Sequence, residues 1–188
     1  MKTDIILAGV GGQGILSIAT ILGAAAISRG LHLKQAEVHG MSQRGGDVQS
    51  NLRISSSPIA SDLIAIGSAD MIVSLEPMEA LRYLPYLAPD GWVVTNTTPF
   101  VNIDNYPPAE AIMAELGKLP RVTAFDMDAV AKEAGNLRCA NMVLLGAASK
   151  HIDIPASDIE KAITEVFAPK GTKIIDMNLA AFRIGASH

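Results

Sequence analysis

Residues 5–14 read Ile-Ile-Leu-Ala-Gly-Val-Gly-Gly-Gln-Gly, and an uncharged segment rich in Ala, Ile and Leu follows them as far as Ser28. A short apolar run, a glycine cluster and a long apolar segment predict a buried strand, a tight turn and a helix. Gly9, Gly11 and Gly14 have the G-x-G-x-x-G spacing, which lets a phosphate approach the backbone while helix amides point at it. The same glycines would also serve tight packing of helix on strand, so both interpretations stay open at this point.

The composition predicts a single domain, residues 1–188, with an aliphatic core. Hydrophobic residues make up 49%, aromatic residues only 4% and charged residues 18% of the chain. The net charge of −4 and the absence of a Lys/Arg run argue against nucleic-acid binding. The one cysteine, Cys139, excludes a disulfide framework, and this chain alone cannot ligate an iron–sulfur cluster or zinc ion through cysteines. We therefore expect a reducing, cytoplasmic setting.

Residues 5–28 carry no charged side chain and are long enough to cross a bilayer. The glycine cluster, however, breaks this run near its start, and the apolar part before it has only the length of a strand. Lys2 followed by Asp4 is also a poor beginning for a secretory signal. We interpret the segment as a strand and a buried helix, and we expect no membrane association.

Strand and helix patterns alternate along the chain, which predicts a three-layer α/β/α fold with a Rossmann-like, mostly parallel sheet. The expected strands cover residues 5–10, 31–38, 48–54, 71–75, 92–97 and 122–125. The expected helices cover residues 15–28, 109–116, 127–134, 139–149 and 173–184, and two more helices are expected to begin at residues 77 and 157. The connection between the second and third strands is too short for a helical crossover. The mixed sheet should therefore contain at least one antiparallel strand.

Local signals predict how some of these elements begin and end. Gly30 suits the left-handed position after the first helix, and Asp126 suits the N-cap of a later one. Ser157 and Glu160 have the spacing of a capping box. Residues 89–91, Pro-Asp-Gly, predict a turn before the strand that follows, and residues 98–108 predict a surface excursion.

A second glycine-rich segment supplies further candidate residues. Residues 39–46 read His-Gly-Met-Ser-Gln-Arg-Gly-Gly, a density of polar side chains that a merely solvated connection would not need. We expect this loop to contact a ligand, a partner or both, through Met41, Ser42, Gln43, Arg44 and Gly45.

Three side chains near this loop have a specific chemistry. The guanidinium of Arg44 offers a planar fork of donors to a carboxylate or phosphate. His39 could titrate near neutral pH and is a weak catalytic candidate, although a lone histidine on a loop more often serves as a hydrogen-bonding spacer. Glu37 lies at about the distance of the acidic residue that holds a ribose hydroxyl in a dinucleotide fold, and it also fits a polar residue at a strand end.

Together, residues 9–14 and 37–46 resemble the gamma-type domain of the 2-oxoacid:ferredoxin oxidoreductases. The Glu-x-His-Gly-Met-x-Gln-Arg-Gly-Gly form of the second segment favours the indolepyruvate branch, in which the small subunit is called beta. The resemblance covers essentially the whole chain, and the two motifs are specific jointly rather than singly. It implies an oxidoreductase subunit that is inactive alone.

The resemblance implies chemistry that lies mostly in a partner. In such enzymes thiamine diphosphate attacks the 2-oxo carbon, carbon dioxide leaves, iron–sulfur clusters carry electrons to ferredoxin, and coenzyme A takes the acyl group. This sequence lacks the G-D-G…N-N pattern of thiamine enzymes and lacks cluster cysteines. A large alpha subunit is therefore expected to hold thiamine diphosphate, Mg²⁺ and the clusters, with no cofactor on this chain alone.

The role of this chain's own residues stays open. The amides of Gly11, Gly12, Gln13 and Gly14 could hold a phosphate of coenzyme A or could close the subunit interface. One alternative is a stand-alone NAD(P)- or FAD-binding oxidoreductase that uses the first glycine turn and Glu37. The short connection between the second and third strands argues against it. Another alternative is a non-catalytic assembly module whose glycine loops only dock against a partner.

Overall fold

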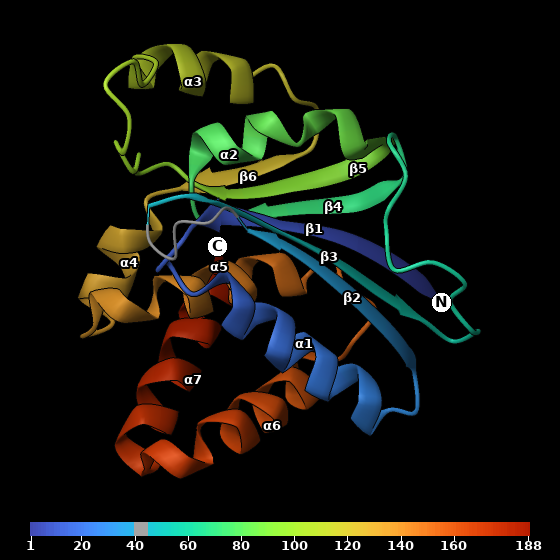
Figure 1. Ribbon diagram of the computed structural model, residues 1–188. Coiled ribbons are helices and arrows are strands. Elements are labelled where there is room, and N and C mark those ends of the chain that lie inside the picture. Colours follow the sequence, from blue (N-terminus) through green and yellow to red (C-terminus); the bar gives the residue numbers. More distant parts are fainter. Residues whose placement is uncertain (40–44) are drawn as a thin grey trace.

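A mixed six-stranded sheet separates two layers of helices (Figure 1). The structure is a computed structural model, and it describes residues 1–39 and 45–188. Helices α2 and α3 cover one face of the sheet, and α1, α5, α6 and α7 lie on the other (Figure 1). The predicted three-layer α/β fold is confirmed.

The strands are β1 (Lys2–Val10), β2 (His32–His39), β3 (Asp47–Ser55), β4 (Ala69–Ser74), β5 (Leu87–Asn96) and β6 (Val122–Phe125). The helices are α1 (Ile15–Ser28), α2 (Pro77–Arg82), α3 (Ala109–Leu116), α4 (Met127–Glu133), α5 (Ala140–Ser149), α6 (Ala156–Phe167) and α7 (Thr172–Ser187), with short 3-10 helices at Leu84–Tyr86, Leu137–Cys139 and Ala168–Lys170.

The order of strands in the sheet is β2-β3-β1-β4-β5-β6. β3 runs antiparallel to both of its neighbours, β2 and β1, whereas β1, β4, β5 and β6 pair in parallel. The antiparallel strand is the one that the short connection after residue 39 predicts. It places β2 at the edge of the sheet, with β3 between β2 and β1.

The opening segment of the sequence forms the centre of this sheet. β1 lies between β3 and β4 and is buried from its second residue onward. Ile5 and Leu7 belong to the core under α1 and α5, while Ile6 and Ala8 belong to the core under α2 and α3. A strand covered on both faces needs apolar side chains on both faces, which is why this stretch reads as a continuous apolar run.

Two of the predicted helix ends are confirmed. Gly30 follows α1 with a φ of 69°, a left-handed conformation that glycine adopts without steric cost. Asp126 precedes α4, and its carboxylate accepts a hydrogen bond of 2.8 Å from the amide of Ala129. Both signals are local, since each depends only on residues within one turn of the helix.

The predicted capping box at Ser157 and Glu160 is wrong. Helix α6 begins at Ala156, directly after Pro155, so Ser157 already lies inside the helix. The carboxylate of Asp158, in the first turn, accepts hydrogen bonds from Arg29 at 2.7 Å and Lys161 at 2.9 Å. Pro155 has no amide hydrogen and a φ of −55°, which lets the helix begin at Ala156, two residues before the start that a cap at Ser157 indicates.

The turn expected at residues 89–91 is also wrong as a strand boundary, because β5 already begins at Leu87. Ala69 pairs with Leu87 and Met71 with Trp92, so two steps along β4 correspond to five along β5. The Pro-Asp-Gly stretch therefore forms an irregularity within the strand pair instead of a turn before the strand.

Helices α5 and α7 cross with their backbones in close contact at two glycines. A Cβ atom on Gly146 would lie 2.0 Å from the carbonyl oxygen of Phe182, and one on Gly185 would lie 2.0 Å from that of Val143. Any side chain at either position would force the two helices apart. This crossing matters for function because both helices line the cavity described below.

Replacing Gly146 by Ala should therefore lower the free energy of unfolding by about 1–3 kcal/mol, the usual cost of overpacking. Urea unfolding followed by circular dichroism would measure the change. Gly117→Ala is the matched control, because its new Cβ would lie no nearer than 3.3 Å to a neighbouring atom and its φ of −66° suits alanine. Equal stability of Gly146→Ala and the wild type would contradict the close crossing.

Candidate functional site

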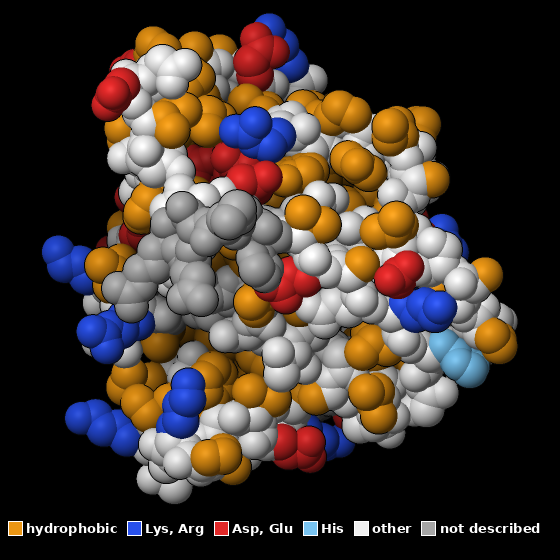
Figure 2. Space-filling view, in the orientation of Figure 1, with side chains coloured by type: hydrophobic (Ala, Val, Ile, Leu, Met, Phe, Trp, Pro, Cys, Tyr) orange, Lys and Arg blue, Asp and Glu red, His pale blue; other side chains and the backbone are white. Residues whose placement is uncertain are grey.

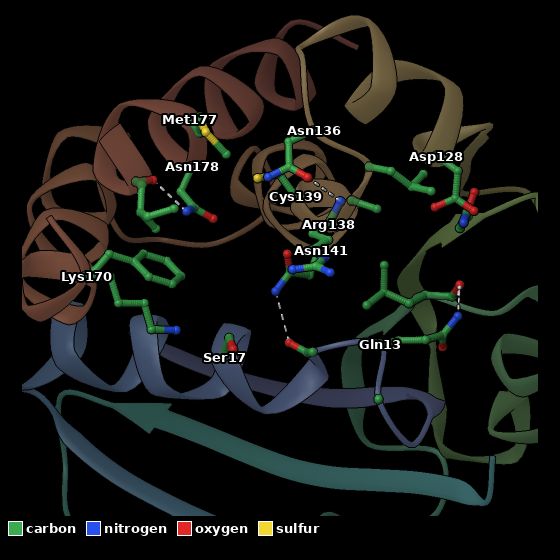
Figure 3. Close-up of a pocket in the computed structure, with 18 residues that line it drawn as sticks. Gln13, Ser17, Asp128, Asn136, Arg138, Cys139, Asn141, Lys170, Met177 and Asn178 are labelled. Atoms are coloured by element: carbon green, nitrogen blue, oxygen red, sulfur yellow. Dashed lines mark hydrogen bonds between the residues drawn. The ribbon is translucent and has the colours of Figure 1, made fainter. Parts of the chain in front are cut away.

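A cavity of about 810 Å³ opens where the carboxyl ends of the parallel strands meet the helical layer of α5 and α7 (Figure 3). In open α/β sheets this edge is the usual place for a ligand, and the volume is that of a typical small-molecule site. The wall of the cavity includes the glycine turn after β1, the end of β5, the start of α5 and the first turns of α7. The residues that line the cavity are Gly12, Gln13, Gly14, Ser17, Leu75, Asn96, Asp128, Asn136, Leu137, Arg138, Cys139, Ala140, Asn141, Phe167, Lys170, Ile174, Met177 and Asn178.

The glycines of the first turn differ in what they do, and Gly9 serves packing. A Cβ on Gly9 would lie 2.9 Å from both Gln13 Oε1 and Ile15 Cγ1. Gln13 in turn accepts a hydrogen bond from the Val10 amide at 2.8 Å and donates one to the carbonyl of Leu75 at 3.2 Å. The Gln13 side chain therefore ties the turn to the end of β4, and its amide group is already engaged.

Gly11 joins the two glycine-rich segments. Its amide donates to the carbonyl of Gly46 at 2.8 Å, and its carbonyl accepts from the amide of Gly45 at 3.2 Å. These bonds continue the β1–β3 ladder past its last pair, Val10 with Asp47. The sequence-based hypothesis that both segments lie at one edge of the sheet holds for Gly45 and Gly46.

Gly12 and Gly14 face the cavity. Gly12 has a φ of 105°, is exposed, and has no atom of the described residues within 4 Å of the place where a Cβ would be. Gly14 precedes α1 with a φ of 88°, and no described side chain caps this helix. Gly14 and Ser17 line the cavity, so the positive dipole end of a 14-residue helix lies at its wall without a side-chain cap.

Asn141 is the buried polar residue of this site. It is 8% exposed, and its Nδ2 donates to the carbonyl of Gly14 at 3.2 Å. The same carbonyl also accepts from the Ser17 amide at 3.1 Å. An amide oxygen facing it would be repelled, so Nδ2 takes this place and Oδ1 is left without a hydrogen-bond partner among the described residues. An unpaired buried acceptor is costly, so a hydrogen-bond donor from a ligand would be stabilised here.

Cationic and anionic side chains occupy different parts of the cavity wall. Arg138 and Lys170 line it from the segments before α5 and before α7, and Ser17 lines it from α1 (Figure 3). The ammonium of Lys170 lies 5.2 Å from the centroid of the Phe167 ring, which steadies this long side chain. Asp128 lines the wall near the end of β5 (Figure 3).

Two titratable groups in the wall are shifted toward their neutral forms. Burial raises the pKa of the Cys139 thiol, which disfavours the nucleophilic thiolate. Burial also raises the pKa of Asp128, an effect that a hydrogen bond from Asn96 opposes and the nearby Asp126 carboxylate increases. The wall is therefore equipped for binding through cations, amides and a carboxamide more than for nucleophilic chemistry.

The remaining sequence-predicted site residues lie elsewhere. Glu37 is exposed on the edge strand β2, paired with Ser50 of β3, and Gly9, Gly11 and Glu37 are not among the residues that line the cavity. His39 ends β2. Met41, Ser42, Gln43 and Arg44 lie outside the described residues, so their predicted contacts stay predictions.

Sequence reasoning missed Asn141, Arg138 and Lys170. Residues 139–149 read as a core helix, and α5 is indeed buried along nearly its whole length. The available signal was the amide side chain of Asn141 among small apolar residues, which is unusual in a purely structural helix. Arg138 and Lys170 carry no local signal, because only the tertiary fold brings them to the glycine turn.

A second polar cluster lies on the other face of the sheet, over α2. Acidic and basic side chains gather there on a surface that is otherwise largely hydrophobic (Figure 2). Glu79 is 3% exposed and accepts hydrogen bonds from Arg82 at 2.7 and 3.2 Å. Burial raises the pKa of Glu79, Arg82 opposes this, and the neighbouring Asp47 carboxylate raises it further. Asp47 itself accepts a hydrogen bond from the Tyr83 hydroxyl at 2.6 Å.

Within residues 1–39 and 45–188 no group of three His, Cys, Asp or Glu side chains is arranged to hold a metal ion. No helix in the same part of the chain has the length and apolar character needed to cross a bilayer.

The fold and the cavity define a Rossmann-like α/β subunit with an anion-suited site at its glycine turn. A family model described as pyruvate ferredoxin/flavodoxin oxidoreductase matches residues 4–188. An indolepyruvate oxidoreductase subunit IorB from Archaeoglobus fulgidus is 36% identical over 98% of this chain and 94% of its own length. The subunit of the same name from Thermococcus kodakarensis is 38% identical over 97% of this chain and 93% of its own length.

Solved structures show the same fold. The gamma subunit of a keto/oxoacid ferredoxin oxidoreductase from Geobacter sulfurreducens has a TM-score of 0.71 and 25% identity, covering 98% of this chain and 96% of that one. A 2-oxoglutarate:ferredoxin oxidoreductase from Magnetococcus marinus, solved with 2-oxoglutarate, coenzyme A and succinyl-CoA, has a TM-score of 0.77 at 24% identity. This chain corresponds to 30% of that longer chain.

The chain therefore belongs to the pyruvate ferredoxin/flavodoxin oxidoreductase family. The resemblance that the two glycine segments predict is confirmed, and the chain is a small subunit of a 2-oxoacid:ferredoxin oxidoreductase.

The raised pKa of Glu79 predicts how stability depends on pH. The pKa of Glu79 is higher in the folded protein than the ordinary value of 4.5, so the folded state binds this proton more tightly than the unfolded state. The bound proton stabilises the fold fully below pH 4.5, and this contribution is lost as the pH rises through the folded pKa. Relative to Glu79→Gln, the wild type should lose unfolding free energy above pH 4.5, with a slope of at most about 1.4 kcal/mol per pH unit for one proton.

Denaturant titrations of both proteins between pH 3 and 8, about one per half pH unit, would measure the difference in their free energies of unfolding. Glu115→Gln is the control, because Glu115 pairs with Lys118 at the same i,i+3 spacing but its side chain is 57% exposed. Because water screens this exposed pair, Glu115→Gln should change the free energy of unfolding by less than about 1 kcal/mol. A difference for Glu79→Gln that grows in the wild type's favour as the pH rises would contradict the assignment.

Proposed function

We propose that this chain is the small subunit of an enzyme that oxidatively decarboxylates an aryl-pyruvate such as indolepyruvate, forms an acyl-CoA and passes the electrons to ferredoxin. The observation that carries the proposal is the similarity to indolepyruvate oxidoreductase subunits, 36–38% identity over nearly the whole of both chains. The glycine segments favour the same branch.

We assign thiamine diphosphate, Mg²⁺ and the iron–sulfur clusters to a larger partner subunit. A four-cysteine cluster cannot be ligated by a chain whose only cysteine is Cys139. That thiol is buried and has a raised pKa, so it is poorly suited to metal or redox chemistry. A free, buried thiol also fits the reducing conditions of the cytoplasm, where we expect the complex to act.

The role we assign to the cavity is to contact coenzyme A, whose thiol takes the acyl group. The uncapped start of α1, Arg138 and Lys170 suit its phosphates. The unpaired Oδ1 of Asn141 requires a hydrogen-bond donor, which inorganic phosphate offers weakly and the amides, hydroxyls and amino group of coenzyme A offer readily. The volume of about 810 Å³ also suits a large ligand better than a small anion.

A stand-alone dinucleotide-binding oxidoreductase fits less well. In a dinucleotide fold the second strand lies next to the first, and its terminal acidic residue reaches the ribose of a nucleotide bound at the glycine turn. Here β3 intervenes between β1 and β2, so Glu37 lies two strands away from that turn. An assembly module remains the second candidate, favoured by the exchange of backbone hydrogen bonds between Gly11 and the segment 45–46.

The proposal predicts that the purified chain is inactive with any 2-oxoacid. Co-expression with the thiamine- and cluster-bearing large subunit of the same organism should give a complex that reduces a viologen dye. The reduction should require an aryl-pyruvate and coenzyme A. Size-exclusion chromatography would measure complex formation, and the absorbance of the reduced dye would measure turnover. Failure of the two chains to associate, or turnover without coenzyme A, would contradict the proposal.

In that complex, Lys170→Ala should raise the KM for coenzyme A by about tenfold, because a charge-assisted hydrogen bond to an anion is lost. The KM for the aryl-pyruvate should not change. Lys173→Ala is the matched control, since Lys173 is an exposed neighbour that does not line the cavity. If Lys170→Ala instead weakens assembly and leaves the KM for coenzyme A unchanged, the assembly-module reading is correct.

A further inference from the structure

Glu76, two residues after β4, carries a carboxylate that is completely buried. Its Oε2 accepts a hydrogen bond from the amide of Glu79 at 2.8 Å. Its Oε1 accepts from the amide of Phe100 at 3.2 Å and also from the hydroxyl of Tyr106. A buried carboxylate is costly unless donors replace water, and these three donors do so. Glu76 thereby joins the start of α2 to the segment between β5 and α3.

We call that segment, residues 97–106, the strap. Phe100 and Tyr106 bind Glu76, and between them Asn102 donates from Nδ2 to the carbonyl of Gly45 at 2.6 Å. The strap is therefore attached to Glu76 on both sides of Asn102, and Asn102 attaches it to the second glycine segment. The sequence predicts only a surface excursion here, because its attachment depends on residues far away in the chain.

Helix α2 makes a second connection to the same segment. Tyr83, directly after α2, donates from its hydroxyl to Asp47 at 2.6 Å. The strap and α2 thus each hold one end of the segment 45–47, and Glu76 holds the strap and α2 together. The segment 45–47 in turn forms the backbone hydrogen bonds with Gly11 that position the turn at the cavity wall.

A simpler interpretation is that Glu76 only caps α2. Capping requires one acceptor for the Glu79 amide, and Ser, Thr, Asp or Asn would supply it with a shorter side chain. The second carboxylate oxygen would then have no function. In this structure that oxygen receives both donors of the strap, and a glutamine could offer acceptor lone pairs on only one oxygen.

We propose that Glu76 is a positioning residue: through the strap and α2 it holds the segment 45–47 against Gly11, and so sets the position of the glycine turn. The titratable and charged groups around this connection are Asp47, Glu79, Arg82, Tyr83, Asp104 and Tyr106, together with Asp126, which accepts a hydrogen bond from Thr98 of the strap at 3.0 Å. The consequence for catalysis rests on the proposed function, because it requires that the cavity beside the turn binds coenzyme A.

Amide hydrogen exchange of the ¹⁵N-labelled full chain tests the connection without any ligand. Tyr106→Phe removes one donor to Glu76, and Asn102→Ala removes the strap's bond to Gly45. Each should make the amides of Gly11 and Gly45 exchange about fivefold faster, the effect of losing one typical hydrogen bond. In the double variant, Tyr106→Phe should add nothing further, because Asn102 transmits its effect.

Tyr86→Phe is the matched control. Tyr86 lies in the same core under α2 and α3, and its hydroxyl has no hydrogen bond among the described residues. It should leave both glycine amides unchanged, and the amide of Ile72 in β4 should report global opening in every variant. The proposal is overturned if Tyr106→Phe accelerates the Phe100 amide alone, or if the two variants act additively on Gly45.

The assembled enzyme separates this inference from the proposed function. Tyr106→Phe should raise the KM for coenzyme A by about two- to fivefold and leave kcat and the KM for the 2-oxoacid unchanged, with Tyr86→Phe as the control. Faster hydrogen exchange of the Gly11 and Gly45 amides together with an unchanged KM for coenzyme A would support the positioning role of Glu76. It would contradict the proposal that the cavity binds coenzyme A. Unchanged exchange would overturn the positioning role whatever the kinetics.

Discussion

The antiparallel register of β1 and β3 is the constraint on which the rest of the site depends. It pairs Val10 with Asp47, and the ladder then continues through the bonds of Gly11 with Gly45 and Gly46, at 3.2 and 2.8 Å. A slip by one residue would turn every side chain of β3 to the opposite face of the sheet. Asp47 would then no longer meet Tyr83, and Asn102 would no longer meet Gly45. The alternation of β3 prevents such a slip, because Leu52 and Ile54 enter the core under α1 and α5 while Asn51 and Arg53 lie on the opposite face.

The local parts of this arrangement could be predicted from sequence. The bounds of the helix at 15–28 and of the elements at 109–116 and 122–125 agree with the structure, because periodicity and flanking glycines act within a few residues. The antiparallel strand followed from one short connection, since chain length alone forbids a helical crossover there. The capping box at Ser157 failed because the preceding Pro155 lets the helix begin earlier, a competition between two local signals.

The site itself was only partly predictable. The glycine turn marked one wall, but Asn141, Arg138 and Lys170 reach it from positions more than a hundred residues later in the chain. The positions of these residues depend on the crossing of α5 and α7, which two glycines permit. No pattern within a single helix reveals such a crossing. The buried hydrogen bonds of Glu76 are equally invisible in sequence, because a Glu before a Pro reads simply as a helix start.

The chemistry of the cavity wall fits the division of labour that we propose between this chain and a larger subunit. Its cations, its uncapped helix start and the unpaired Oδ1 of Asn141 are all groups that hold a ligand. Two further titratable groups, Cys139 and Asp128, are shifted by burial toward the neutral form, which opposes nucleophilic attack by either. Under the proposed function, this site orients coenzyme A and does not activate it. In that proposal the partner subunit supplies the reacting centre, and the position of the glycine turn decides how well coenzyme A meets it.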